Sequence, residues 1–269
     1  MHNLQLQSQE QTALRNTLRA PQQPRDAHKD EHHFSVALAQ SEDEVRECQA
    51  LRYAIFAGEM GAQLDKHEPG IDRDIFDPYC EHLLVRNTLT QEVVGTYRIL
   101  TPEQARRIGT YYSEAEFFLT RLKNLMPRMA EVGRSCVHAD FRSGSVIMLL
   151  WSGLAQFMKQ RGYEYLMGCA SVSMHDGGHQ AASLFRQMRG VHIAPPEYQT
   201  FPKTPLPLDK LNNTLAVEAP PLLKGYLRLG AQVCSAPAWD PDFNTADFLV
   251  LLAMSKMNPR YAKHFGIEQ

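Results

Sequence analysis

One segment in the middle of the chain, residues 130–162, limits the possible folds more than any other. The stretch "AEVGRSCV" at 130–137 has the pattern of a buried strand, and "SVIMLLWSGLAQFMKQR" at 145–161 predicts a long helix that Gly162 ends. The turn "RSG" at 142–144 lies between them. A turn that leads from a strand into a helix directs backbone N–H groups beyond the strand end, where they can hold a phosphate. Such units are common, so this pattern alone is equally compatible with a purely structural turn.

Strand and helix patterns alternate along the chain and predict an α/β sandwich with a mixed sheet. Strand patterns occupy residues 34–38, 80–87, 92–100, 130–137, 163–172 and 246–257. Helix patterns occupy residues 44–60, 102–109, 114–126, 145–161, 178–190 and 220–233, and Ser41 is the predicted N-cap of the first. We expect three parts: a disordered tail at 1–33, a core at 34–200, and a helix–strand extension at 201–269 packed on the core.

Composition and charge argue against several classes of protein. The chain has 269 residues, 43% of them hydrophobic, and a net charge of −2, which argues against nucleic acid as a partner. Its longest apolar run, "VIMLLW", is far shorter than the roughly 20 residues that a membrane span needs. The N-terminus lacks the apolar core of a signal peptide, so we expect a cytoplasmic protein.

The cysteines and histidines do not have the spacing of a metal site. The five cysteines are an odd number without CxxC spacing, so buried free thiols are expected rather than disulfides or zinc ligands. His175 and His179 are four residues apart, but the glycine pair between them breaks the helix that would align them on a metal. We therefore expect no metal.

Glu131 and Arg134 place two charges in the strand pattern that precedes the turn. On a regular strand, side chains three residues apart point to opposite faces of the sheet. A β-bulge would turn both side chains towards one cleft, and bulges are frequent beside active sites. The alternative is a partly buried ion pair between the two residues.

The order of these segments resembles the GCN5-related N-acyltransferase fold, in which the turn after the fourth strand holds the pyrophosphate and pantetheine of an acyl donor. The turn of that family reads Arg/Gln-x-x-Gly-x-Gly/Ala, whereas this chain has Ser145 and Ile147 at the two glycine positions. Without glycine the backbone approaches a pyrophosphate less easily. The departure disfavours coenzyme A and favours a carrier-tethered phosphopantetheine, which has one phosphate and no nucleotide.

Further motifs narrow the resemblance. The stretches "LRYAIF", "DRDIFDPYCEHLLV", "VVGTYRIL" and "EVGRSCV" together resemble two groups that use acyl carrier protein. These are the acyl-homoserine-lactone synthases and the ornithine N-acyltransferases of ornithine-lipid synthesis, which are often labelled hemolysin-like. The C-terminal stretches "LLKGYLRLGAQV", "PDFNTADFLVLL" and "NPRYAKHF" resemble the ornithine group and not the lactone synthases. The resemblance covers roughly residues 34–265.

This resemblance implies an enzyme that moves a 3-hydroxyacyl chain from acyl carrier protein to the α-amine of L-ornithine, giving a lyso-ornithine lipid. It implies no bound cofactor, because phosphopantetheine arrives with the acyl carrier protein, and it is compatible with peripheral contact at the inner membrane. The alternatives are a lactone synthase, an N-acyltransferase for another amino acid such as glycine, and a non-catalytic, membrane-active hemolysin-like protein. No lytic amphipathic helix in the sequence supports the last alternative.

The candidate site residues fall into three sets. Amide formation needs a base for the amine and donors for the oxyanion, and Glu131 and Arg134 are the predicted catalytic pair, with Glu131 as general base. The predicted acceptor-binding residues are Arg52, Asp74, Asp77 and Arg98. The predicted donor-binding residues are Val137, His138, Arg142, Ser143, Gly144 and Ser145.

Several of these residues have structural alternatives. Arg98 can grip a carboxylate or form a buried salt bridge with Asp77, because an unpaired charge in its apolar strand would be costly. Arg52 can line the site or, as we favour, fix the acidic loop at 61–78, while the aspartates can bind a cationic amino acid or cap that loop. The backbone near His138 can donate to an oxyanion.

Overall fold

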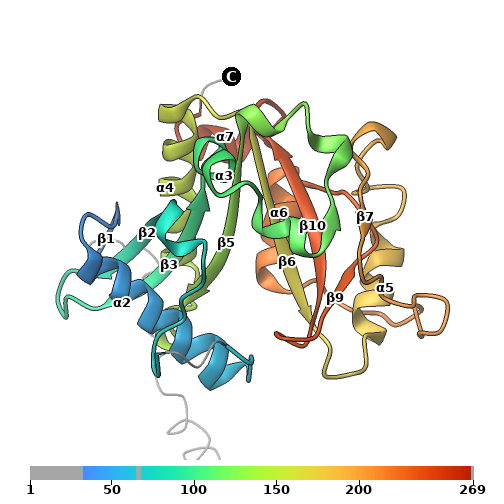
Figure 1. The fold of residues 1–269 in the computed structure, drawn as a ribbon, viewed down its shortest axis with the longest axis horizontal. Helices are drawn as coiled ribbons and strands as arrows, with labels where there is room; N and C mark the ends of the chain where they lie inside the picture. The colour runs from blue at the N-terminus through green and yellow to red at the C-terminus, as the bar shows by residue number, and fades with distance from the viewer. Residues whose placement is uncertain (1–32, 65–67, 268–269) are drawn as a thin grey trace, which may run out of the picture. The chain divides into compact units, whose positions relative to one another are not determined.

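A mixed sheet organises the structure, a computed structural model that describes residues 33–64 and 68–267 (Figure 1). The predicted disordered tail, apart from residue 33, lies outside the described residues. The strand order is β1-β2-β3-β5-β6-β10-β8, and β9 pairs with β10 outside this path. Neighbouring strands are antiparallel except for β5 and β6, which are parallel.

The elements have the following bounds. The strands are β1 (Phe34–Leu38), β2 (Cys80–Asn87), β3 (Val93–Leu100), β4 (Phe117–Phe118), β5 (Met129–Val137), β6 (Tyr165–Ser173), β7 (Phe201–Pro202), β8 (Gln232–Val233), β9 (Ala238–Asp240) and β10 (Thr245–Ala253). The helices are α2 (Glu42–Tyr53), α3 (Pro102–Ile108), α4 (Ser145–Arg161), α5 (His179–Met188), α6 (Pro221–Leu229) and α7 (Pro259–His264). A short π-helix, Ala54–Glu59, continues α2.

Helices cover both faces of the sheet. Leu150 of α4, Leu184 of α5 and Leu223 of α6 join strand side chains in one buried core on the first face. On the second face, α2 and the segment 102–128 bury separate apolar clusters. The strand β3 is buried along nearly its whole length because both of its faces are covered, which explains its almost continuous apolar sequence.

Strands β5 and β6 pair for only three residues and then diverge (Figure 1). Their ladder joins residues 129–131 of β5 to residues 165–167 of β6. A Cβ at Gly168 would lie 2.5 Å from the Val132 carbonyl oxygen, so glycine permits the close contact at which the strands begin to part.

The bulge that the sequence suggested for β5 is present. The β3–β5 register shifts between Thr96 and Arg98, so Tyr97 lies opposite two residues of β5, Arg134 and Ser135. Arg134 has a φ of 51°, which is uncommon for a residue other than glycine. The extra residue reverses which face of the sheet each later side chain meets.

The helix predicted at 114–126 is wrong. The chain there forms 3-10 turns at Tyr112–Ala115 and Thr120–Leu122 around the short strand β4. The apolar residues that suggested a helix, including Phe117 and Leu122, are buried in the core of the second face. Tertiary packing therefore overrides the local periodicity.

The C-terminal segment contributes to the central sheet itself. β10 pairs with β6 over nine residues, from Thr245 opposite Ser173 to Ala253 opposite Tyr165. The predicted helix at 220–233 ends at Leu229, and β8 follows it. The described residues from His33 onwards form one packing unit.

Candidate active site

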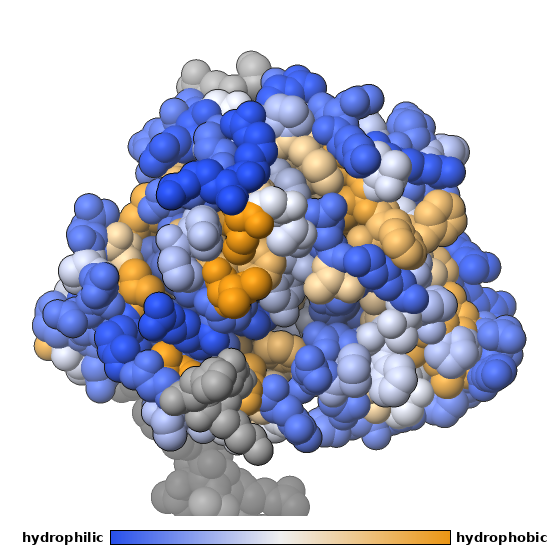
Figure 2. All heavy atoms as spheres, in the orientation of Figure 1, coloured by the Kyte–Doolittle hydropathy of each residue, from blue (hydrophilic) through white to orange (hydrophobic). Residues whose placement is uncertain are grey.

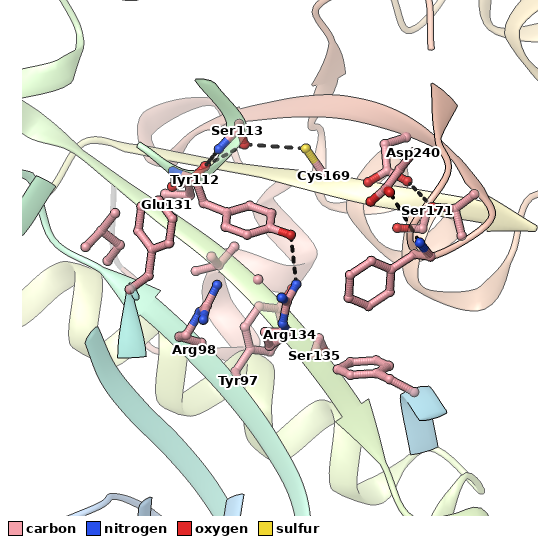
Figure 3. A pocket seen from close by; sticks show the side chains of 18 of the residues that line it. Tyr97, Arg98, Tyr112, Ser113, Glu131, Arg134, Ser135, Cys169, Ser171 and Asp240 are labelled. Atoms are coloured by element: carbon pink, nitrogen blue, oxygen red, sulfur yellow. Dashed lines mark hydrogen bonds between the residues drawn. The ribbon is translucent and has the colours of Figure 1, made fainter. Parts of the chain in front are cut away.

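A pocket of about 190 Å³ lies where β5 and β6 separate (Figure 3). Arg98, Glu131 and Arg134 line it on the β3–β5 side, and Cys169 and Asp247 line it on the β6–β10 side. The bulge thus brings Glu131 and Arg134 to one pocket, although the two residues are three apart on a strand.

Glu131 is the last residue of β5 that pairs with β6, and it is only 4% exposed. Its carboxylate accepts hydrogen bonds from the Tyr112 N–H at 2.6 Å, and from the N–H and hydroxyl of Ser113 at 2.8 and 2.5 Å. Burial raises the pKa of Glu131, while the hydrogen bonds from Ser113 and Tyr112 act in the opposite direction. A carboxylate with a raised pKa is better suited to accept a proton near neutral pH than an exposed one.

Arg134 does not pair with Glu131 among the described residues. It lies instead in an arginine–aspartate network formed by Arg52, Arg98, Arg134, Asp72, Asp74 and Asp77. Its Nη2 is 3.2 Å from Asp74, and its Nη1 donates to the Tyr112 hydroxyl at 3.0 Å. The ion pair between Glu131 and Arg134, which was the structural alternative, is therefore absent among the described residues, and Arg134 belongs to a wider network.

The network is largely buried, and its three arginines match its three aspartates in charge. Fully buried Arg52 contacts Asp72 at 2.7 Å and Asp77 at 2.8 Å, so it fixes the acidic loop. Arg98 contacts Asp74 at 2.7 Å and Asp77 at 2.9 Å, which includes the predicted salt bridge. Burial alone would raise the pKa of Asp77, but the charges of Arg52 and Arg98 hold it well below its usual range.

Only part of this network reaches the pocket. Its lining includes Arg98 and Arg134 but not Arg52, Asp74 or Asp77. The Tyr112 ring lies between the two pocket arginines, with its centroid 5.3 Å from the Arg98 guanidinium and 5.0 Å from that of Arg134. The network therefore presents two guanidinium groups and an aromatic ring to the pocket, and the aspartates behind them hold the arginines in place.

The opposite wall carries two carboxylates that the sequence patterns did not indicate, Asp240 and Asp247, and Glu116 joins them in an acidic cluster from outside the pocket lining. Asp240 ends β9, Asp247 lies in β10, and Glu116 immediately precedes β4. One ligand atom each from Glu116, Asp247 and Cys169 lies within 4.8 Å of the others. A signal for Asp247 was available, because a carboxylate within "ADFLVLL" is as unexpected as Arg98 within "VVGTYRIL".

The predicted donor-binding residues surround the turn between β5 and α4. His138 N–H donates to the Val94 carbonyl at 2.8 Å, so it is not available to an oxyanion, contrary to our expectation. Val137 pairs with Gly95 in the β3–β5 ladder. None of the six predicted residues is among those that line the pocket, but Arg142 is 2.7 Å from Glu59, the neighbour of pocket-lining Met60.

The start of α4 has the features of an anion-binding turn. Gly144 has a φ of 117°, which favours glycine, and it precedes the first helical residue, Ser145. No side chain caps this helix end, so the N–H groups of the first turn remain open to a ligand. Arg142 and Ser143 are exposed beside them.

The face of the molecule in Figure 2 is largely hydrophilic, with separate apolar patches, one of them over β4 and β7. The paired residues Phe118 and Phe201 are 56% and 58% exposed there. Within residues 33–64 and 68–267, no helix combines the length and apolar character that crossing a membrane would require.

The chain is similar to known acyltransferases in sequence. The acetyltransferase (GNAT) domain family matches residues 51–152. The L-ornithine N(alpha)-acyltransferase of Brucella abortus (strain 2308) is 35% identical over 256 residues, which are 87% of this chain and 89% of that protein. The protein of the same name from Rhizobium meliloti (strain 1021) is 35% identical over 253 residues, covering 87% of this chain and 85% of that protein.

The fold has a solved counterpart. A CoA-dependent acyl-homoserine lactone synthase, BjaI, superposes with a TM-score of 0.50 at 14% identity, covering 88% of this chain and 90% of that one. At this identity the likeness concerns the fold alone. Together with the GNAT family match, it confirms the predicted acyltransferase-like mixed sheet flanked by helices.

Proposed function

Because this chain belongs to the L-ornithine N(alpha)-acyltransferase family, we propose that it transfers a 3-hydroxyacyl group from acyl carrier protein to the α-amine of L-ornithine. The product would be an Nα-acyl-ornithine, a lyso-ornithine lipid. The observation that carries this proposal is the buried carboxylate of Glu131 in a pocket that opens where β5 and β6 diverge.

The reaction joins an amine to a thioester carbonyl. The neutral α-amine attacks the carbonyl carbon, a C–N bond forms, and the C–S bond breaks as the carrier thiol leaves. Glu131 takes the proton that the amine loses, directly or through a water molecule, and that proton is returned to the leaving thiolate or to solvent. Its raised pKa suits this exchange, since the carboxyl must both accept and release a proton near neutral pH.

The arginine side of the pocket suits the carboxylate of an amino acid. Arg98 and Arg134 are held by the aspartates of the network and present cationic groups to the pocket. A guanidinium can bind a carboxylate through two parallel hydrogen bonds. With the carboxylate on these groups, the adjacent α-amine would lie close to Glu131, because both are attached to the same carbon of the substrate.

The donor site lies at the α4 N-terminus in this proposal. Its uncapped N–H groups and the neighbouring Arg142 suit the single phosphate of phosphopantetheine. Ser145 and Ile147 stand where the family's turn has glycines, which supports a carrier-bound donor over coenzyme A.

The donor can be tested with matched thioesters. Purified full-length protein is given L-ornithine and the same 3-hydroxyacyl chain on acyl carrier protein or on coenzyme A, and kcat/KM is measured for each. We expect a much higher kcat/KM with acyl carrier protein. Equal values for the two donors would remove the carrier from the proposal, and no product with either would remove the proposed function.

A further inference from the structure

The acidic cluster lacks a positive partner in the described part of the chain. No lysine or arginine within residues 33–64 and 68–267 forms an ion pair with Glu116, Asp240 or Asp247. Asp247 is 5% exposed, and Thr245 donates to it at 2.8 Å. Glu116 and Asp240 are half-buried, and a buried carboxylate such as Asp247 without a counter-charge is costly, so this group calls for a proton or a cation.

Glu116 gives an independent sign of a missing partner. Its Oε2 is buried and accepts no hydrogen bond from the N–H and O–H groups of the described residues, and the neighbour of its side chain is another carboxyl group, that of Asp247. Burial, followed by the charges of Asp247 and Asp240, raises the pKa of Glu116 to about 9. An unsatisfied buried oxygen in a native structure is expected to meet a ligand, a water molecule or a proton.

Two members of the cluster, Asp240 and Asp247, line the same pocket as Glu131 but on its opposite side, and Glu116 lies next to Asp247 outside the lining. Figure 3 shows Asp240, Ser171 and Cys169 across the pocket from Arg98 and Arg134. One side of the pocket therefore presents two guanidinium groups, the other presents carboxylates, and Glu131 lies on β5 where the two strands part. A molecule bound across it should have a carboxylate at one end and a cation at the other.

We propose that Asp240 and Asp247, with Glu116 beside Asp247 outside the lining, bind the side-chain ammonium of the acceptor amino acid and thereby select ornithine over amino acids with uncharged side chains. This inference rests on the proposed function. An ammonium offers three N–H donors, which can satisfy oxygens of both pocket carboxylates, Asp240 and Asp247, at once. Binding at this end would also hold the δ-amine away from the acyl donor, so acylation would occur on the α-amine.

A metal ion is the competing occupant, because Glu116, Cys169 and Asp247 converge. A metal binds the thiolate form of cysteine, and burial raises the pKa of Cys169 well above its ordinary value. Burial therefore opposes the thiolate that a metal ion needs, which favours an ammonium hydrogen-bonded to the carboxylates.

The test compares L-ornithine with L-norvaline, which has the same carbon chain without the ammonium. Acylation of both by the full-length wild-type protein is measured with one saturating donor, together with Asp247→Asn and Glu116→Gln. Asp242→Asn is the matched control, because exposed Asp242 lies two residues from Asp240 but not in the pocket lining.

We expect wild type to prefer ornithine over norvaline by on the order of 10²-fold or more in kcat/KM, and Asp247→Asn to lower this ratio at least about tenfold. The control should keep the wild-type ratio. An unchanged ratio in both cluster variants would overturn the inference, as would equal wild-type rates with the two amino acids.

Two further results separate the alternatives. No acylation of either amino acid by wild type would contradict the proposed function itself. Loss of ornithine acylation on treatment with a chelator, restored by Zn²⁺, would assign the cluster to a metal and overturn the inference. If a variant does not fold, calorimetry of ornithine binding to wild type still tests the inference. Release of protons on binding is expected, because a bound cation lowers the raised pKa values of Glu116 and Asp247. Binding without proton release would count against the subsite.

Discussion

The arginine–aspartate network and the acidic cluster both place charges next to the same pocket, but the cost of burying these charges is compensated differently in the two regions. The network matches each aspartate with arginines, and the pKa of Asp77 is held well below its usual range. In the acidic cluster, burial raises the pKa of Glu116 to about 9 and that of Asp247 to about 6. The charges of the network are balanced without a ligand, whereas the charges of the cluster are balanced only when a proton or a cation is bound.

This difference suggests that the two regions have different roles in substrate binding. A network that is already neutral can hold its arginines in fixed positions before substrate arrives, which favours orientation. A cluster that lacks its counter-charge gains most when a cation enters, which favours selection. Each of the following experiments alters one side of this comparison, or the carboxylate between the two sides.

The largest effect is expected from Glu131→Gln, which removes the proposed base between the two regions. Turnover should fall on the order of 10²–10⁴-fold. In wild type, burial raises the pKa of Glu131, so the rate should fall as pH drops through a value above that of an ordinary glutamate. Rates are measured across pH, and a melting curve checks that the variant is folded.

The glutamine side chain in that variant would also meet the N–H groups of Tyr112 and Ser113 with an amide in place of a carboxylate. A folded variant with near-wild-type turnover would therefore show that Glu131 only caps the turn at 112–115.

Breaking the network should mainly cost stability. Arg52→Met leaves buried Asp77 without one of its arginines, and we expect a loss of about 3–5 kcal/mol in the free energy of unfolding. The control is Arg46→Met on the same helix, which removes an exposed ion pair with Glu68 and should leave the free energy of unfolding nearly unchanged. Denaturant unfolding of both variants measures the difference, and similar small losses would contradict a structural role for the network.

Neutralising Asp247 in the acidic cluster should raise the free energy of unfolding, whereas Arg52→Met lowers it. Because the folded-state pKa of Asp247 is raised to about 6, the folded state holds this proton more tightly than the unfolded state. Stability without ligand should therefore decrease as pH rises from about 4 through 6. Asp247→Asn should then be more stable than wild type by about 1–2 kcal/mol at pH 8, and the difference should vanish near pH 4.

Denaturant unfolding at the two pH values checks this sign. Asp77 provides the internal contrast, since its lowered pKa adds stability that is lost only as pH falls below about 4. A variant less stable than wild type at pH 8 would mean that Asp247 is paired in the folded protein.

The smallest effect is expected outside the pocket, at the turn before α4. Arg142→Glu should raise the apparent KM for the carrier-bound donor several-fold and leave that for ornithine nearly unchanged, because acyl carrier proteins are acidic. Exposed Arg260, on α7, gives the matched control Arg260→Glu. Initial rates are compared at salt concentrations of roughly 0.01 and 0.15 M, and an equal rise in KM for both substrates would contradict docking at this turn.

The sequence was informative where charge interrupts an apolar strand. Glu131, Arg134 and Arg98 were predictable because each breaks a strand pattern, and the bulge in β5 follows as the geometry that places the first two together. The resemblance to acyltransferases supplied the fold, since the order of elements and motifs is local information.

The acidic cluster was not predictable in the same way. Its carboxylates come from β9, β10 and the turn before β4, and they meet only because β10 pairs with β6. The segment 114–126, which includes Glu116, was predicted as a helix, so this residue was assigned to the wrong kind of element. Long-range strand pairing decides both points, and periodicity within one segment does not report it.

The position of the new amide in the product tests the central claim most directly. Wild-type protein is incubated with L-ornithine and 3-hydroxyacyl carrier protein, and the product is fragmented by tandem mass spectrometry to locate the acyl group. If Arg98 and Arg134 hold the carboxylate while the acidic cluster holds the δ-ammonium, the acyl group must be on the α-nitrogen and the δ-amine must be free. A product acylated on the δ-nitrogen, or a mixture of the two, would contradict this arrangement of the pocket.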